Sequence, residues 1–81
     1  MNIDNQLKEV FKKTFKIEDE DFNTNLEINS IPKWDSMGHV RLFLQIEKKF
    51  NLKIENEDIE SALNFKSILK VLKIYLDEKR K

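Results

Sequence analysis

Glycine and proline are almost absent from this chain, and their scarcity constrains the fold more than any other feature. The 81 residues include one glycine, Gly38, and one proline, Pro32. Tight hairpins and successive short strands depend on these two residue types for their turns. Helices need them less, because a helix can also end at Asn. The sequence therefore predicts an all-α protein, and its length allows a single domain over residues 1–81.

Residues 3–15 form the first predicted helix. Apolar residues recur there at intervals of three and four, which places them on one helical face. The members of this face are Ile3, Leu7, Val10, Phe11 and Phe15. The charged residues of the opposite face are Lys8, Glu9, Lys12 and Lys13. Such a helix is amphipathic and is expected to bury one side.

Residues 16–35 change character and are expected to form a long loop. The segment begins with an acidic run, residues 18–21, and continues with polar residues and Pro32. Loops of this length are uncommon in compact domains. The apolar residues spread along it are Ile17, Phe22, Leu26, Ile28 and Ile31. We expect them to hold the loop against the core in an ordered state, with the large side chain of Trp34 as a further anchor.

A second helix is predicted to begin at Asp35-Ser36 and to end at Asn51. Asp is a favourable N-cap residue, because its carboxylate accepts hydrogen bonds from the first free backbone amides. Pro32 prevents the helix from starting earlier. A broad apolar face of this helix is expected to be buried. The residues assigned to that face are Met37, Val40, Leu42, Phe43, Leu44, Ile46 and Phe50.

A short third helix over residues 56–62 is expected to be capped by Asn56, and a last helix is predicted after Asn64. The apolar stripe of the last helix is Ile68, Leu69, Val71, Leu72, Tyr75 and Leu76. The lysines expected to face water are Lys66, Lys70 and Lys73. Three longer helices and a short one, with a long loop between the first two, predict a small four-helix bundle.

The residues that the chain lacks exclude several kinds of site. With no Cys and a single His, His39, there are no disulfides, thiolate metal sites or histidine clusters, and we expect no bound metal. His39 lies three residues after Ser36, but neither an orienting acid nor an oxyanion hole is evident for this pair. We therefore assign no catalytic residue and interpret His39 as a surface side chain.

Charge and hydropathy restrict the expected partners and location. Acidic and basic residues number 15 each, for a formal net charge of zero, whereas nucleic-acid-binding domains usually have a basic excess. No apolar run approaches the ~20 residues needed to span a bilayer, and the N-terminus lacks a signal-peptide pattern. We expect a cytoplasmic monomer that binds no nucleic acid and does not insert into a membrane. The basic end, Lys79-Arg80-Lys81, is interpreted as a solvated tail beside a helix C-terminus.

The stretch from Trp34 to His39 contains the candidate functional residue, Ser36. A serine in the first turn of a helix lies near unpaired backbone amides and the positive end of the helix dipole. A phosphate ester is favoured there, but the dipole contributes only about 0.3–1 kcal/mol at an exposed site. A phosphate compound that is needed there permanently must therefore be attached covalently. Taken alone, these residues also fit a plain Asp cap followed by a small polar residue.

Over nearly its whole length the chain resembles the acyl carrier proteins. The matching features are the amphipathic first helix, the long loop and the motif Asp35-Ser36-Met37, whose usual form in that family is Asp-Ser-Leu. Trp34 and the Gly38-His39 pair flank the motif, and the rest of the second helix, residues 40–50, follows at the right distance. A short acidic helix and a final helix after Asn64-Phe65 complete the likeness.

The resemblance implies a function and a prosthetic group. In this family a carrier-protein synthase (a phosphopantetheinyl transferase) moves 4′-phosphopantetheine from coenzyme A to the serine of the motif. Here that serine is Ser36, with Asp35 and Met37 beside it. The thiol of the arm then holds an acyl group as a thioester and presents it to acyl-loading and acyl-transferring enzymes, which carry out the catalysis. The chain is thus expected to be a carrier, not an enzyme.

The resemblance also assigns the second helix to partner recognition and the space beside it to the acyl chain. The implied recognition residues are Gly38, His39, Val40, Arg41, Glu47 and Lys48. The possible lining of an acyl pocket is Phe43, Ile46, Ile54, Ile59 and Phe65. Carriers that serve fatty-acid synthesis are strongly acidic along this helix, whereas Arg41 and Lys48 are basic here. Because charge complementarity governs partner choice, this departure favours a specialised carrier of a lipid, polyketide or sugar-modification pathway.

Two other functions fit the same residues. Because the loading enzyme chooses the cargo, a peptidyl or aminoacyl carrier of a nonribosomal or cell-envelope pathway is also compatible. The alternative from another class is a helical interaction module without a prosthetic group, such as a DNA-binding domain. Zero net charge and Glu47 on the would-be recognition helix count against DNA. Modification of Ser36 would distinguish a carrier from a module.

Overall fold

The computed structural model describes residues 2–79, with side chains for residues 2–77. Within this part the chain forms α1 (Ile3–Phe15), α2 (Ser36–Phe50), α3 (Asn56–Ser61) and α4 (Phe65–Lys79). One turn of 3-10 helix, η1 (Asp19–Asp21), interrupts the loop between α1 and α2. The predicted all-α fold and helix order are confirmed. The interpretation of Lys79-Arg80-Lys81 as a solvated tail falls on side chains outside the described residues.

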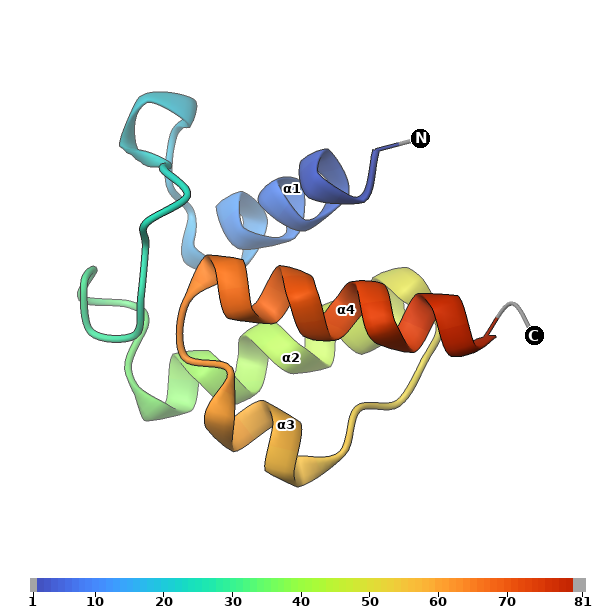
Figure 1. The fold of residues 1–81 in the computed structure, drawn as a ribbon. Coiled ribbons are helices and arrows are strands. Elements are labelled where there is room, and N and C mark those ends of the chain that lie inside the picture. Colours follow the sequence, from blue (N-terminus) through green and yellow to red (C-terminus); the bar gives the residue numbers. More distant parts are fainter. Residues whose placement is uncertain (1, 80–81) are drawn as a thin grey trace.

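Three helices lie side by side, and the fourth is a short connector (Figure 1). α1 packs against α2 and α4, and it runs antiparallel to both of them. α3 lies beside one end of this group, between the end of α2 and the start of α4 along the chain. None of the helices described combines the length and apolar character needed to cross a bilayer.

Side chains and left-handed residues define the helix ends. The Asn2 side chain accepts a hydrogen bond from the Asp4 amide (2.8 Å) at the start of α1. The Asn64 side chain accepts one from the Ser67 amide (2.8 Å) at the start of α4. α2 ends at Asn51, as predicted, in the left-handed conformation that often terminates helices.

The predicted cap of the third helix is wrong by one position. Asn56 is the first helical residue of α3, and the N-cap position belongs to Glu55, whose backbone is extended. The side chain of Glu55 makes no capping hydrogen bond. α3 also ends one residue earlier than predicted, at Ser61. A helix this short has little backbone bonding of its own, so its position depends on contacts with the rest of the protein.

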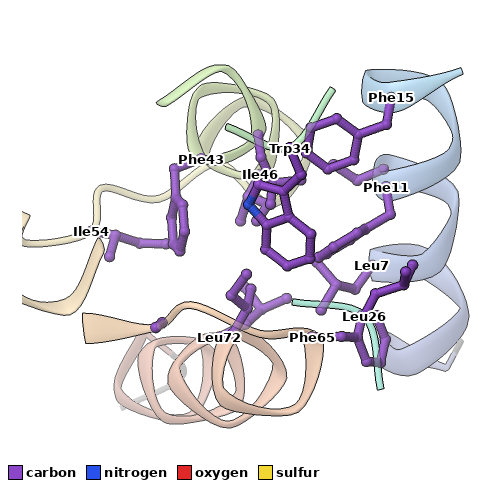
Figure 2. Close-up of a cluster of buried hydrophobic side chains, with 14 residues drawn as sticks. Leu7, Phe11, Phe15, Leu26, Trp34, Phe43, Ile46, Ile54, Phe65 and Leu72 are labelled. Carbon is purple, nitrogen blue, oxygen red and sulfur yellow. The ribbon is translucent and has the colours of Figure 1, made fainter. Parts of the chain in front are cut away.

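Aromatic rings from distant segments form the centre of the core (Figure 2). The Phe11 ring meets those of Phe15, Trp34 and Phe65 edge to face, with centroids 5.1–5.9 Å apart. Trp34 is fully buried although it belongs to the loop. Its predicted role as a loop anchor is therefore confirmed. Edge-to-face pairs contribute about 0.5–1.5 kcal/mol each beyond the area that they bury.

The loop between α1 and α2 is ordered, as predicted. Leu26 is buried in the core, and its carbonyl accepts a hydrogen bond from the Phe65 amide (2.9 Å). The Ile28 amide donates to the carbonyl of Leu63 (2.8 Å). These two bonds join the loop to the start of α4. The loop can therefore stay compact although it contains only one helical turn.

The predicted buried face of α2 is partly wrong. Leu42, Phe43 and Ile46 are buried as expected. Met37 and Val40 are 71% and 56% exposed, and Leu44 is 50% exposed. α2 carries more apolar residues than its core-facing side can hold, and the surplus lies on the opposite side of the helix.

Candidate functional site

Ser36 is the first residue of α2, and it is exposed. The preceding residue, Asp35, caps the helix, because its Oδ1 accepts a hydrogen bond from the Gly38 amide (2.8 Å). This confirms the predicted N-cap. The free amides of a first helical turn give it positive character. The hydroxyl of Ser36 is therefore accessible at the positive end of a 15-residue helix.

His39 is part of a buried hydrogen-bonded chain. The Trp34 indole Nε1–H donates to His39 Nδ1 (3.0 Å). His39 Nε2 lies 2.7 Å from the carbonyl oxygen of Ile59 in α3. An indole N–H can only donate, so Nδ1 accepts and Nε2 carries the hydrogen that is donated to Ile59. These two hydrogen bonds link the loop, the first turns of α2 and the short helix α3.

The interpretation of His39 as a surface residue is therefore wrong. Its side chain is only 6% exposed and is stacked on Trp34, with ring centroids 6.1 Å apart. Both ring nitrogens have partners, which removes the usual cost of burying a polar side chain. His39 cannot contact a partner protein from this position, and its place beside Ser36 is structural.

Gly38 is also buried, and no other residue fits its position. A Cβ atom there would overlap the backbone oxygen of Lys33 and lie 3.2 Å from a ring carbon of Phe15. The loop thus passes directly over the first turn of α2. Gly38 allows this close approach and, like His39, does not belong to an exposed recognition surface.

The exposed apolar residues of α2 begin next to Ser36. Met37, Val40 and Leu44 recur at helical spacing and share one side of the helix. We call these three residues the apolar strip. Exposed apolar groups that lie together mark binding sites more often than single exposed ones do.

A surface cavity of about 340 Å³ lies between α2 and α3, beside the apolar strip. Of the predicted pocket residues, Phe43, Ile54 and Ile59 line it. Ile46 and Phe65 do not, because both side chains point into the central core. The remaining lining residues are Val40, Leu44, Glu47, Lys53, Asn56 and Glu60. The cavity therefore has apolar walls and a polar rim.

The chain segment that frames this cavity is held by two side chains. Glu47 Oε2 accepts a hydrogen bond from the Ile54 amide (2.9 Å). The Tyr75 hydroxyl of α4 donates to Asp58 Oδ2 and accepts from the Glu55 amide (3.0 Å). The bond to the Asp58 carboxylate raises the pKa of Tyr75 above its usual value. These bonds attach the segment around α3 to α2 and α4.

The predicted recognition residues separate into three groups. Gly38 and His39 are buried, and Val40 and Glu47 line the cavity toward α3. Arg41 and Lys48 are exposed and line another surface, toward α1. Leu44, Lys53, Asn56 and Glu60 line the cavity but were not predicted as site residues. The surplus of apolar residues in α2 was a signal for Leu44, whereas nothing local marks the other three.

The side chains of residues 2–77 bring together no group of three or more of the types His, Cys, Asp and Glu that could hold a metal ion. A scan against models of known protein families gives no match. A search among curated proteins likewise finds no similar protein.

Proposed function

We propose that this chain is a carrier protein that holds an acyl or aminoacyl group on a 4′-phosphopantetheine arm attached to Ser36. The observation that carries the proposal is the exposed position of Ser36 at the N-terminus of α2, next to the apolar strip. The resemblance to acyl carrier proteins in motif and helix spacing supports the same function. When attached, the group supplies a terminal thiol that holds its cargo as an activated thioester.

The residues around Ser36 fit the attachment of such a group. The Ser36 hydroxyl oxygen would form a bond to the phosphorus on the pantetheine side of the coenzyme A pyrophosphate. The bond from that phosphorus to the bridging oxygen would break, and 3′,5′-ADP would leave. The hydroxyl proton would pass to a base of the synthase. Asp35 would hold the first turn of α2 in place through its bond to Gly38.

The surroundings of Ser36 also fit an apolar cargo. Val40 and Leu44 of the apolar strip also line the cavity, which extends to Ile59. Burying apolar cargo there would contribute roughly 25 cal/mol for each Å² removed from water. The basic side chains Arg41 and Lys48 favour partners other than those of acidic carriers. We therefore favour a specialised lipid, polyketide or sugar-modification pathway, and an aminoacyl carrier fits the same geometry.

Intact-mass measurement tests the proposal. The unmodified protein is incubated with coenzyme A, Mg²⁺ and a carrier-protein synthase of broad specificity. We expect a mass gain equal to one phosphopantetheine, which Ser36→Ala abolishes. Ser61→Ala is the matched control, because Ser61 is also exposed but lies at the end of α3. No mass gain in the parent would favour the interaction module, and a gain in Ser36→Ala would place the attachment elsewhere.

Two substitutions at Asp35 separate its roles. Asp35→Ala removes both the cap and the charge, and Asp35→Asn keeps a capping oxygen without the charge. Loss of the cap costs typically ~1 kcal/mol. We expect both variants to be modified more slowly than the parent, because both lack the carboxylate beside Ser36 that would help to bind the Mg²⁺ used in the transfer. If Asp35→Asn is modified at the parent rate, Asp35 acts only as a cap.

A further inference from the structure

A second exposed surface of α2 faces α1 and is lined by basic side chains. It is a groove of about 470 Å³ between the two helices, and we call it the basic groove. Its basic residues are Lys13 of α1 and Arg41, Lys48 and Lys49 of α2. All four are exposed. The other lining residues are Val10, Thr14 and Gln45, so no acidic residue lines it.

The cations of the basic groove form no ion pair with an acidic side chain of residues 2–77. Among the side chains of residues 2–77, the ion pairs are made by Lys8, Lys12 and Lys73, and none of these lines the groove. Four neighbouring cations without partners create a positive potential that attracts anionic groups. An anion bound there would also relieve the repulsion among them.

The positive surface continues toward Ser36. A neighbouring hollow of about 360 Å³ shares Thr14 and Arg41 with the basic groove and adds Lys16 and Lys33. It reaches Asp35, which directly precedes Ser36. Arg41 therefore lies where the two hollows meet, in the middle of a row of cations.

Helix dipoles explain only part of this arrangement. Lys13 lies in the last turn of α1, and Lys48 and Lys49 lie in the last turn of α2, where cations are favoured. The two helices are antiparallel, so these last turns lie toward opposite ends of the groove. Arg41 lies in the second turn of α2, where the dipole gives no such preference. The cations of the groove are thus more than those of two capped helix ends.

We propose that the basic groove binds an acidic helical segment of a partner protein. Helices commonly dock in grooves between two other helices, and carboxylates along one face would meet this row of cations. A formal net charge of zero argues against an extended polyanion such as a nucleic acid or a membrane surface, whereas a single acidic helix needs only the local charge of the groove.

The basic groove lies toward α1 and the cavity toward α3, and the apolar strip borders the groove, because Arg41 and Lys48 follow Met37 and Leu44 by one helical turn. The proposal is independent of any modification of Ser36, because it is drawn from the charges between α1 and α2. Its test therefore uses the unmodified full-length protein.

The test measures binding of a fluorescent peptide by anisotropy at low salt. The probe is an alanine-based helical peptide of about 20 residues with glutamates four residues apart along one face. A second peptide has Gln in place of each Glu. The groove variant is Lys13→Glu with Lys48→Glu. The matched control is Lys66→Glu with Lys70→Glu, which makes the same charge change on exposed lysines of α4.

We expect the parent to bind the Glu peptide at least ~10-fold more tightly than the Gln peptide, and added salt to weaken this binding. The groove variant should lose ~10-fold in affinity, and the control variant less than about 2-fold. Should circular dichroism show that the groove variant is unfolded, Lys13→Gln with Lys48→Gln replaces it and should lose a smaller factor.

Three results would overturn the proposal. The first is equal binding of the Glu and Gln peptides by the parent. The second is an equal loss in the groove and control variants, which would indicate a response to net charge alone. The third comes from two rival probes, a single-stranded oligonucleotide and vesicles of phosphatidylcholine with phosphatidylserine. If binding of either probe depends on the groove lysines and is tighter than binding of the Glu peptide, the occupant is not an acidic protein helix.

Discussion

The two sides of α2 are stabilised by different interactions. Toward α1 and the start of α4, the rings of Phe11, Phe15 and Trp34 are fully or almost fully buried and pack against one another (Figure 2). Toward α3 apolar packing contributes less, because α3 itself contains no buried side chain and only its Ile59 packs, partly buried, against the core. Hydrogen bonds to the Ile59 carbonyl and the Asp58 carboxylate also hold α3.

This difference shows how a small domain can combine a stable body with an adjustable edge. Buried aromatic area is stabilising and insensitive to small displacements of the surface. Individual hydrogen bonds contribute only about 0.5–1.5 kcal/mol each to stability, so a segment held by a few of them can open locally while the rest stays folded. The cavity lies at this second edge, so local opening of α3 would change its shape.

The largest expected effect on stability is on the side of α2 that faces α1 and the start of α4, which we call the aromatic side. Trp34→Ala should lower the free energy of unfolding by about 3–5 kcal/mol, because it empties a fully buried site. Ile59→Ala in α3 should cost less than about 2 kcal/mol, because Ile59 is only partly buried. Denaturant titrations followed by circular dichroism measure both values. Equal losses would show that the two sides do not differ as described.

A close contact on the aromatic side gives the next effect. Gly38→Ala should destabilise the protein by about 1–3 kcal/mol, because the new methyl group would overlap the Lys33 carbonyl oxygen. Helix propensity alone predicts the opposite sign, since Ala is better than Gly by about 1 kcal/mol inside a helix. The sign of the change in a denaturant titration therefore decides between contact and propensity. A stabilised variant would mean that the loop does not pass so near α2.

On the α3 side, Tyr75→Phe should cost about 0.5–1.5 kcal/mol and should act locally. We expect faster amide hydrogen exchange in α3 and no change in α1. Exchange that accelerates equally in both helices would contradict a separate edge.

The same contact has a pH signature. Asp58 raises the pKa of Tyr75, so the bond stabilises the fold below the usual tyrosine range and is lost as pH rises through the raised value. Tyr75 is the only tyrosine, which makes its phenolate absorbance a direct readout. Asp58→Asn should lower this pKa, and an unchanged titration curve would mean that the bond is not formed in solution.

The smallest expected effect on stability concerns a surface ion pair on the aromatic side. Lys12 forms an ion pair with Asp19 of η1, which lowers the pKa of Asp19. The pair therefore stabilises the fold above the normal Asp range and is lost as pH falls through the lowered value. We expect Asp19→Asn to change stability near neutral pH only slightly, because the loop is already held by its buried residues. A loss as large as that of Tyr75→Phe would show that the loop depends on this pair.

Local patterns were sufficient to predict the helices and the position of Ser36. The apolar period located the longer helices, and Asp35 and Asn51 mark the two ends of α2 as their residue types predict. These features depend on residues within one or two turns, so they can be found without knowledge of the tertiary structure.

Features that depend on distant segments were not predictable. His39 is buried because an indole and a carbonyl of Ile59, 20 residues away, satisfy its ring. Met37 is exposed because no neighbouring element covers that side of α2. Periodicity shows that a face is apolar but does not show what lies opposite it. For the same reason Phe65 was placed at the cavity, although its ring packs in the centre of the core.

Trp34 is the only tryptophan of the chain, and it is fully enclosed two residues before Ser36. Its fluorescence should therefore be that of an indole shielded from water. Because its N–H is hydrogen-bonded to His39, any event at the start of α2 that displaces the loop would change the wavelength or intensity of this fluorescence. The protein thus contains an intrinsic fluorophore at the place where modification is proposed, and titrations can follow that place without a dye.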